Sequence, residues 1–252
     1  MHCRHHLSNA TSVDSLLVPR LTPPVAPVRE RRSVTAPAGD VFSPWMIQQE
    51  ASMSKAQSPL AISDPRRAQI TLRKNARTAR AGLSEDERER ASEKIADTVI
   101  RSSWFRRSKL VACYLPMPEE VDTWTLIDRA WRMKKRIFAP IIKKNLAMQF
   151  CELTAESKLV FNQYGLREPQ DGEIIEPRAL DLVITPVVAF DDDCNRLGMG
   201  GGYFDRTFSF LRHRQYLFHP KLIGLAFSCQ RVEKIAPNPW DIRVFRVIDE
   251  TT

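Results

Sequence analysis

The chain has 252 residues, of which 43% are hydrophobic and 27% charged, and its formal net charge is +8. No apolar run reaches the roughly eighteen residues that cross a bilayer, so no membrane span is expected. The positive charge favours anionic ligands, but the bases are interleaved with acids and no nucleic-acid-binding motif occurs, so no nucleic-acid partner is expected. Five cysteines with no CxxC pair are typical of a cytoplasmic protein.

Residues 1–65 differ in composition from the rest of the chain. They hold eight of the 17 prolines, with much Ser, Thr and Ala and little apolar periodicity. Such a segment buries too little apolar surface to offset its loss of entropy on folding. We therefore expect a disordered N-terminal extension, followed by one domain over residues 66–250. Alternatively, translation starts at Met46 or Met53 and the upstream residues are an artefact.

Two helices are expected at the start of this domain. Residues 66–81 form a basic helix, with Ile70, Leu72 and Ala76 as contact positions. Residues 84–87 read as a capping box, so a second helix begins there and extends to about residue 100.

Short apolar runs and helical periodicity alternate through the rest of the chain. The expected strands cover residues 110–115, 136–139, 147–153, 180–185, 187–190, 222–227 and 244–248, and the expected helices cover 123–133 and 203–211. This order predicts a Rossmann-like α/β fold, a three-layer sandwich with a mostly parallel sheet flanked by helices. Ligands bind such sheets at the carboxyl ends of the strands, where the turns at 116–122, 191–202 and 228–241 fall.

Residues 196–206, Arg-Leu-Gly-Met-Gly-Gly-Gly-Tyr-Phe-Asp-Arg, form the most informative segment. A glycine-rich turn before a helix presents backbone N–H groups to an anion, and the helix dipole adds to the attraction. An ordinary tight turn is the alternative. Anion binding is favoured by Arg196, Asp205 and Arg206, whose charges suit a phosphate–metal complex. The segment is neither a Walker A loop nor a complete G-x-G-x-x-G fingerprint.

Several segments together resemble the 5-formyltetrahydrofolate cyclo-ligase family, also called 5,10-methenyltetrahydrofolate synthetase. In chain order they are residues 114–123, 165–169, 181–191, 196–206, 223–227 and 240–241. The resemblance covers about residues 66–250. It implies an enzyme that uses ATP and Mg²⁺ to close 5-formyltetrahydrofolate to 5,10-methenyltetrahydrofolate, by attack of the formyl oxygen on the γ-phosphate. Positioning and charge neutralisation are the main tasks of a protein in phosphoryl transfer.

The resemblance also implies roles for particular residues. Arg196 and Asp205 are the expected catalytic residues, and Asp205 and Asp241 the expected magnesium ligands. The expected ATP contacts are Arg73, Arg196, Leu197, Gly198, Met199, Gly200, Gly201, Gly202, Tyr203 and Phe204. The expected folate contacts are Leu115, Glu120, Met199, Gly200, Gly201, Gly202 and Tyr203, with Glu119 as a neighbouring candidate.

Each of these residue types also has a simpler explanation. Tyr203 and Phe204 also suit a hydrophobic helix start, Asp205 a first-turn acid and Asp241 a turn residue. The first helix departs from the family, because the position expected to hold a lysine is Gln69, for which Arg66 or Arg67 is a possible substitute. Gly201 stands where some members have lysine.

Two alternatives remain at this stage. A Rossmann-type oxidoreductase needs the complete dinucleotide fingerprint, which is missing here. A non-catalytic folate- or nucleic-acid-binding module is favoured only by Gln69. The expected partners are small-molecule substrates, with no nucleic acid and no membrane, and the expected state is a monomer or weak homodimer.

Overall fold

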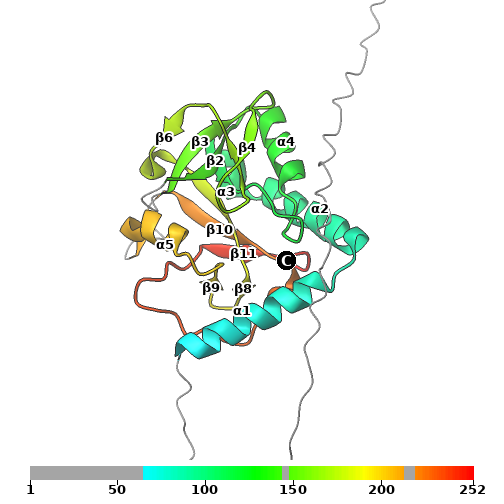
Figure 1. Ribbon diagram of the computed structural model, residues 1–252. Helices are drawn as coiled ribbons and strands as arrows, with labels where there is room; N and C mark the ends of the chain where they lie inside the picture. The colour runs from blue at the N-terminus through cyan, green and yellow to red at the C-terminus, as the bar shows by residue number, and fades with distance from the viewer. Residues whose placement is uncertain (1–64, 144–147, 213–218) are drawn as a thin grey trace, which may run out of the picture. The chain divides into compact units, whose positions relative to one another are not determined.

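The computed structural model describes residues 65–143, 148–212 and 219–252, shown as a ribbon in Figure 1. The N-terminal extension expected to be disordered therefore lies outside the described residues, except for Pro65. Two helices open the described part, α1 (Pro65–Ala81) and α2 (Glu85–Arg101). The predicted capping box is confirmed, because the Ser84 hydroxyl accepts from the Glu87 N–H and the Glu87 carboxylate accepts from the Ser84 N–H.

A seven-stranded sheet forms the centre of the fold, in the order β11-β10-β7-β1-β2-β3-β6. The four pairings among β11, β10, β7, β1 and β2 are parallel, and β3 and β6 are antiparallel additions. The strands are β1 (Leu110–Cys113), β2 (Arg136–Ile142), β3 (Met148–Leu153), β6 (Ile174–Ile175), β7 (Leu182–Pro186), β10 (Lys221–Leu225) and β11 (Arg246–Ile248). The predicted mostly parallel sheet is confirmed.

Helices cover both faces of this sheet, as expected for a three-layer sandwich. Side chains of α2, α3 (Ser103–Arg107) and α4 (Trp124–Arg132) pack with Val111 and Cys113 of β1 on one face. Ala112 points to the other face, where it packs with Phe208 and Leu211 from the segment after the glycine loop. This division follows from the alternation of side chains along a strand.

Strand β2 extends further than the sequence predicts. The expected end at Pro140 is wrong, because the strand continues to Ile142 and Pro140 lies opposite Phe150 of β3. Beyond Phe138, β2 has lost β1 as a neighbour and pairs only with β3. Proline is tolerated where a strand has one open side, because its missing N–H then costs no ladder hydrogen bond.

The helix expected over 203–211 is also interrupted. It consists of α5 (Tyr203–Thr207) and a 3-10 turn over Ser209–Leu211. Between them lies Phe208, whose fully buried ring contacts the rings of Phe150 and Phe204 at centroid distances of 5.7 and 6.3 Å. The helix is therefore interrupted at a residue whose ring packs in the core, and helical periodicity in the sequence does not reveal this packing.

Two hairpins lie outside the central sheet. They are a hairpin of β4 (Leu159–Phe161) and β5 (Arg167–Pro169), and a hairpin of β8 (Ala189–Phe190) and β9 (Arg196–Leu197). Of their strands the sequence pattern predicts only β8, within the strand expected over 187–190. Helix α1 packs through Ala76 and Leu72 against residues of the second hairpin, and Figure 1 shows it running alongside β8 and β9. None of the helices in the described ranges combines the length and apolar character needed to cross a membrane.

Candidate active site

The β8–β9 hairpin carries the glycine loop and is held by one buried carboxylate, that of Asp191. Its Oδ1 accepts from the N–H groups of Asp193 and Asn195, at 3.1 and 2.9 Å. Its Oδ2 accepts from the Asn195 side-chain amide and from the Ile235 N–H, both at 2.9 Å. Four donors converge on a residue that is 2% exposed, so Asp191 fixes the turn that delivers Arg196 to the site.

We expect Asp191→Ala to lower the free energy of unfolding by about 2 kcal/mol or more, because it leaves the buried N–H groups of Asn195 and Ile235 without an acceptor. Urea unfolding followed by circular dichroism measures this change. The matched control is Asp193→Ala in the same loop, which removes only a surface ion pair with Lys234 and is expected to leave the unfolding midpoint unchanged. Equal unfolding curves for the two variants would refute the anchoring role.

The glycine loop has the backbone conformation that its sequence predicts. Gly200 and Gly202 have φ values of +106° and +63°, which other residues adopt only with strain. Gly202 is also the N-cap of α5 and supplies no side-chain acceptor, so the first N–H groups of α5 lack the usual capping partner. Met199 is 55% exposed at the tip. The loop therefore offers backbone donors at an open surface.

Arg196 and Asp205 lie at the two ends of this loop and contact each other. The Arg196 Nη2 donates to Asp205 Oδ1 at 3.1 Å, and the side chains are only 4% and 18% exposed. The same Oδ1 accepts from the Ile242 N–H at 3.0 Å. The Arg196 Nε is buried and has no hydrogen-bond partner among the described residues. The site thus holds a desolvated cation with an unused donor beside the glycine loop.

The Asp205–Ile242 hydrogen bond brings Asp241 next to the site. The Asp241 carboxylate closes a turn, since its Oδ2 accepts from the backbone N–H and the side-chain amide of Asn238, at 2.8 and 3.0 Å. The described residues contain no cluster of three or more His, Cys, Asp or Glu side chains that could hold a metal by itself. Mg²⁺ with a nucleotide needs only one or two carboxylates, the rest being phosphate oxygens and water. Asp205 and Asp241 fit that requirement.

Helix α1 is tied to both loops of the site. The Arg73 Nε donates to the Gly198 carbonyl at 2.9 Å, and the Gln69 side-chain amide donates to the Ala236 carbonyl at 2.9 Å. Gln69 is 5% exposed, whereas Ile70, expected as a contact position, is 63% exposed. The buried face of α1 is thus marked by Gln69, Ala76 and Arg80, and the prediction for Ile70 is wrong.

The segment after β1 contributes a second group of residues. Leu115 is buried at 8% exposure, and the Glu120 side chain is 9% exposed, with its Oε2 accepting from the Met117 N–H at 3.1 Å. Burial raises the pKa of Glu120, while the Met117 N–H and the nearby Arg80 oppose this rise. Glu119 is half-exposed and pairs with Arg80 at 3.2 Å. The more buried carboxylate, Glu120, is the one suited to bind a ligand that excludes water.

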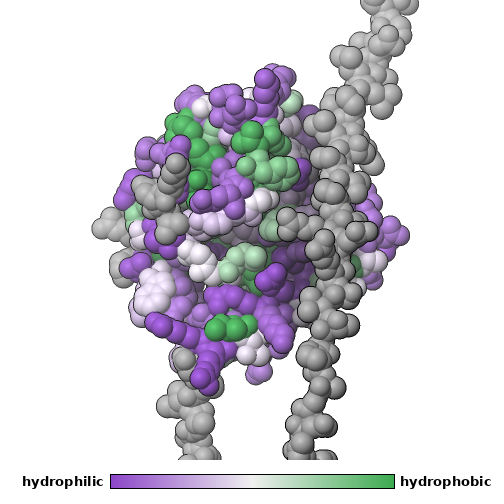
Figure 2. Space-filling view, in the orientation of Figure 1, coloured by the Kyte–Doolittle hydropathy of each residue, from purple (hydrophilic) through white to green (hydrophobic). Residues whose placement is uncertain are grey.

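A groove of about 490 Å³ lies along α1 and reaches Glu119 in the segment after β1. It is lined by Ile70, Arg73, Lys74, Arg77, Thr78, Arg80, Ala81 and Glu119. Hydrophilic side chains predominate over α1 in the space-filling view (Figure 2). Four bases against one acid make the groove suitable for anionic ligands.

Two tyrosines meet above the glycine loop. The ring of Tyr164, from the β4–β5 turn, lies edge-on to Tyr203 at a centroid distance of 6.3 Å. A hydrogen bond to Tyr164 raises the pKa of Tyr203. Phe204 instead stacks on Phe208, with ring planes 19° apart. The rings of Tyr203 and Phe204 are both partly buried and pack against the cluster that contains Phe208.

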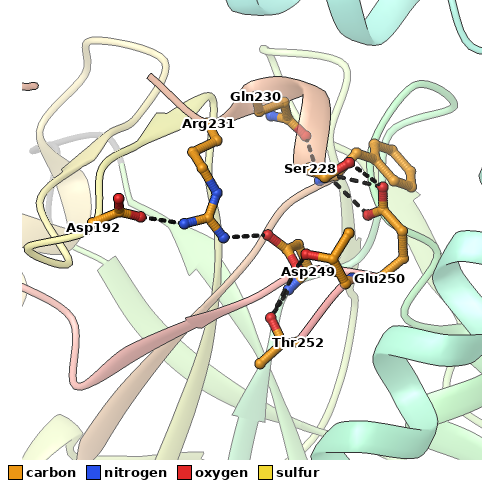
Figure 3. A network of polar contacts seen from close by, with 9 residues as sticks. Asp192, Ser228, Gln230, Arg231, Asp249, Glu250 and Thr252 are labelled. Atoms are coloured by element: carbon orange, nitrogen blue, oxygen red, sulfur yellow. Dashed lines mark hydrogen bonds and ion pairs between the residues drawn. The ribbon is translucent and has the colours of Figure 1, made fainter. Parts of the chain in front are cut away.

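A polar network links the turn of the β8–β9 hairpin to the C-terminal residues of the chain (Figure 3). Arg231 pairs with Asp192 and with the buried Asp249, the latter at 2.9 Å. The Asp249 carboxylate also accepts from the hydroxyl groups of Thr251 and Thr252. Burial would raise the pKa of Asp249, but these hydrogen bonds outweigh it and the pKa is lowered. The last residues of the chain thus brace the loop that precedes Arg196.

Comparison with known proteins decides the family. The sequence profile of the 5-formyltetrahydrofolate cyclo-ligase family matches residues 65–250.

The chain belongs to the 5-formyltetrahydrofolate cyclo-ligase family.

Two bacterial relatives and one solved structure agree with this result. The chain is 33% identical to the Escherichia coli K12 5-formyltetrahydrofolate cyclo-ligase over 176 residues, which is 68% of this chain and 94% of that protein. It is 29% identical to the Haemophilus influenzae enzyme over 181 residues, 70% of this chain and 95% of that protein. The structure of Aquifex aeolicus 5,10-methenyltetrahydrofolate synthetase superposes with a TM-score of 0.64 at 32% identity, covering 73% of this chain and 90% of that one.

These matches do not favour the two alternatives, the Rossmann-type oxidoreductase and the non-catalytic binding module. Gln69, at the position where the resemblance led us to expect a lysine, anchors α1 to the loop at Ala236. Sequence reasoning missed Asp191 and Arg80 as site-forming residues. A signal existed for Arg80, which lies seven and eleven residues after Arg73 and Gln69 and so on the same helix face.

Proposed function

We propose that this cyclo-ligase converts 5-formyltetrahydrofolate to 5,10-methenyltetrahydrofolate with consumption of ATP and release of ADP and phosphate. The match of the family over residues 65–250 carries this proposal. It is supported by the Arg196–Asp205 pair at the glycine loop, because a buried guanidinium with an unused donor suits a transferring phosphoryl group.

The reaction divides into two steps. The formyl oxygen attacks the γ-phosphorus, the bond to the β-phosphate oxygen breaks, and ADP leaves. N10 of the folate then attacks the activated formyl carbon and gives up its proton, and the formyl oxygen departs with the phosphate. Both steps depend on holding the formyl oxygen beside the γ-phosphate and on neutralising negative charge.

The chain supplies groups for both requirements. The N–H groups at the glycine loop and the start of α5 bind phosphate oxygens, and Arg196 neutralises the charge on the transferring group. Arg73, held against the Gly198 carbonyl, adds positive charge at the same loop. Mg²⁺, when bound with the nucleotide through Asp205 and Asp241, supplies further neutralisation of the phosphates.

The folate lies between the loop and the segment after β1. The Glu120 carboxylate accepts from the adjacent N–H donors of the pterin, its N3 and 2-amino groups, and Leu115 packs against the ring. Residues Met199 to Tyr203 contact the folate from the other side. This arrangement directs the formyl group towards the nucleotide and keeps water away from the activated intermediate.

The test is a single reaction with two readouts. Purified full-length protein is mixed with 5-formyltetrahydrofolate and Mg-ATP, and the absorbance of the methenyl product and the released phosphate are followed together. We expect equal amounts of both, and no methenyl product without ATP. Phosphate release that does not depend on the folate would show an ATPase instead, and no reaction would refute the proposal.

We also infer that residues 66–250 contain the complete catalytic domain. Deleting residues 1–62 is expected to leave kcat, both KM values and the thermal midpoint unchanged, since the family match begins at residue 65. Parallel assays and calorimetry of the full and shortened chains measure this. A large fall in either activity or midpoint would assign a structural role to the extension.

We infer a cytoplasmic enzyme that is a monomer or weak homodimer. Four cysteines of the described part (Cys113, Cys151, Cys194 and Cys229) are free, which agrees with a reducing compartment.

A further inference from the structure

Arg80 has an unusual position for an arginine in the last turn of a helix. Such side chains normally extend their charged end into water. Arg80 is instead 3% exposed, and its guanidinium points at the segment that follows β1. Its Nη2 lies 3.2 Å from Glu119 Oε2, its Nη1 lies 4.0 Å from Glu120 Oε1, and its Nε has no hydrogen-bond partner among the described residues. A buried charge is retained at a cost only where other groups compensate it.

The two carboxylates that face Arg80 differ in exposure. The Glu119 side chain is 52% exposed, and an ion pair with so much water contributes little. The Glu120 side chain is 9% exposed and needs a nearby cation to remain charged. Only one of its oxygens, Oε2, receives the Met117 N–H. The other oxygen, Oε1, faces Arg80 at a distance too long for a direct hydrogen bond, so it can still accept from a ligand.

We propose that Arg80 is a positioning residue, which keeps the Glu120 carboxylate charged and oriented to accept the paired N–H donors of the pterin. This inference rests on the proposed function, because it takes the folate as the ligand of Glu120. Arg80 acts through Glu120 and contributes to folate binding, whereas Arg73, which also lines the groove, contacts the glycine loop through the Gly198 carbonyl and serves the nucleotide.

The charges around Glu120 define the expected pH dependence. In the described part, the charged groups that act on the pKa of Glu120 are Arg80 on α1 and the neighbouring Glu119. Glu120 in turn helps to raise the pKa of the buried Tyr114, which directly follows β1 and is also affected by Cys113 and Asp122. Burial raises the pKa of Glu120, and Arg80 works against this rise. Without Arg80 the carboxyl group takes up its proton at higher pH. The neutral acid accepts the donor pair poorly. As the pH is lowered, the variant therefore loses folate binding at a higher pH than the intact enzyme does.

The main experiment compares Arg80→Met with the intact full-length enzyme. We expect the KM for 5-formyltetrahydrofolate to rise about tenfold or more, the loss of one charge-assisted interaction, while the KM for ATP stays within about twofold. The loss of kcat/KM for the folate is expected to be larger at pH 6 than at pH 8. Equal rises in both KM values, or a pH-independent loss, would show a general structural role and refute the proposal.

A double-mutant cycle tests whether Arg80 acts through Glu120. Arg80→Met, Glu120→Gln and the double variant are assayed for folate KM, and the double variant leaves no buried charge unpaired. We expect it to be no worse than Glu120→Gln alone. If the folate KM of the double variant rose by the product of the two single-variant increases, Arg80 would act independently of Glu120. Arg80→Lys, which keeps the charge, should restore folate KM to within about threefold and remains informative if Arg80→Met folds poorly.

Two controls separate this inference from the proposed function. Arg101→Met removes an exposed arginine of α2 that pairs with Asp97, and it should leave both KM values unchanged. Glu89→Gln removes an exposed carboxylate of α2 and should not weaken folate binding, because it leaves Arg80 and Glu120 untouched. An intact chain that makes no methenyl product refutes the proposed function. An active intact chain whose Arg80 variants behave normally refutes only the role of Arg80.

Discussion

Asp205→Asn is expected to lower kcat by about 100-fold or more while the protein remains folded. Asparagine retains an acceptor for the Ile242 N–H, so the loop keeps this contact. It removes the negative charge that faces Arg196 at 3.1 Å and that we propose binds Mg²⁺. Steady-state kinetics at several Mg²⁺ concentrations measure the effect, and we expect the concentration required for half-maximal rate to increase. Asp205→Ala should lose nearly all turnover.

The matched control is Glu233→Gln, which removes a carboxylate from an exposed position after β10. It should keep full activity and the same Mg²⁺ dependence. If Asp205→Asn behaved like this control, Asp205 would not be a metal ligand, and its role would be limited to the first turn of α5. Thermal unfolding of each variant shows whether a loss of rate reflects a loss of fold.

Arg196→Ala is expected to lower kcat by about 100-fold, the roughly 3 kcal/mol that one preorganised donor contributes to a transition state. The side chain is 4% exposed, so its charge acts in a medium with little water to screen it. Single-turnover measurements of phosphate release isolate the chemical step. A higher KM for ATP with unchanged kcat would assign Arg196 to nucleotide binding alone.

Two further variants make the Arg196 result specific. Arg196→Lys keeps a charge beside Asp205 but lacks the planar fork, and we expect a loss between those of alanine and the intact enzyme. Arg178→Met removes an exposed arginine that stacks on Phe210, and it should leave the kinetics unchanged. A lysine variant as slow as the alanine variant would show that guanidinium geometry, beyond its charge, is required.

Local sequence signals predicted much of the fold and part of the site. The capping box at Ser84 marked the start of α2, because its two hydrogen bonds join residues only three apart. The apolar run beginning at Leu110 marked the central parallel strand β1, which is buried on both faces. Gly200 and Gly202 marked a turn with positive φ, because only glycine adopts that conformation without strain.

The contacts between distant segments were beyond such signals. Nothing local in Pro140 shows that β2 passes through it, since this depends on the absence of β1 as a neighbour beyond Phe138. The same holds for Asp191, whose fourth donor comes from Ile235, 44 residues away. Sequence placed Arg196 and Asp205 on one loop, but their contact depends on the fold of that loop.

By itself, the sequence determined the main helices, most strands of the central sheet and the backbone of the glycine loop, because these depend on residues close together in the chain, and its ordered motifs determined the family. Only the tertiary structure decided that Gln69 anchors α1, that Tyr203 meets Tyr164 while Phe204 stacks on Phe208, and that Arg80 lies beside Glu120. Burial and charge pairing depend on which segments pack against each other in the folded chain, and residue type and spacing do not specify that packing.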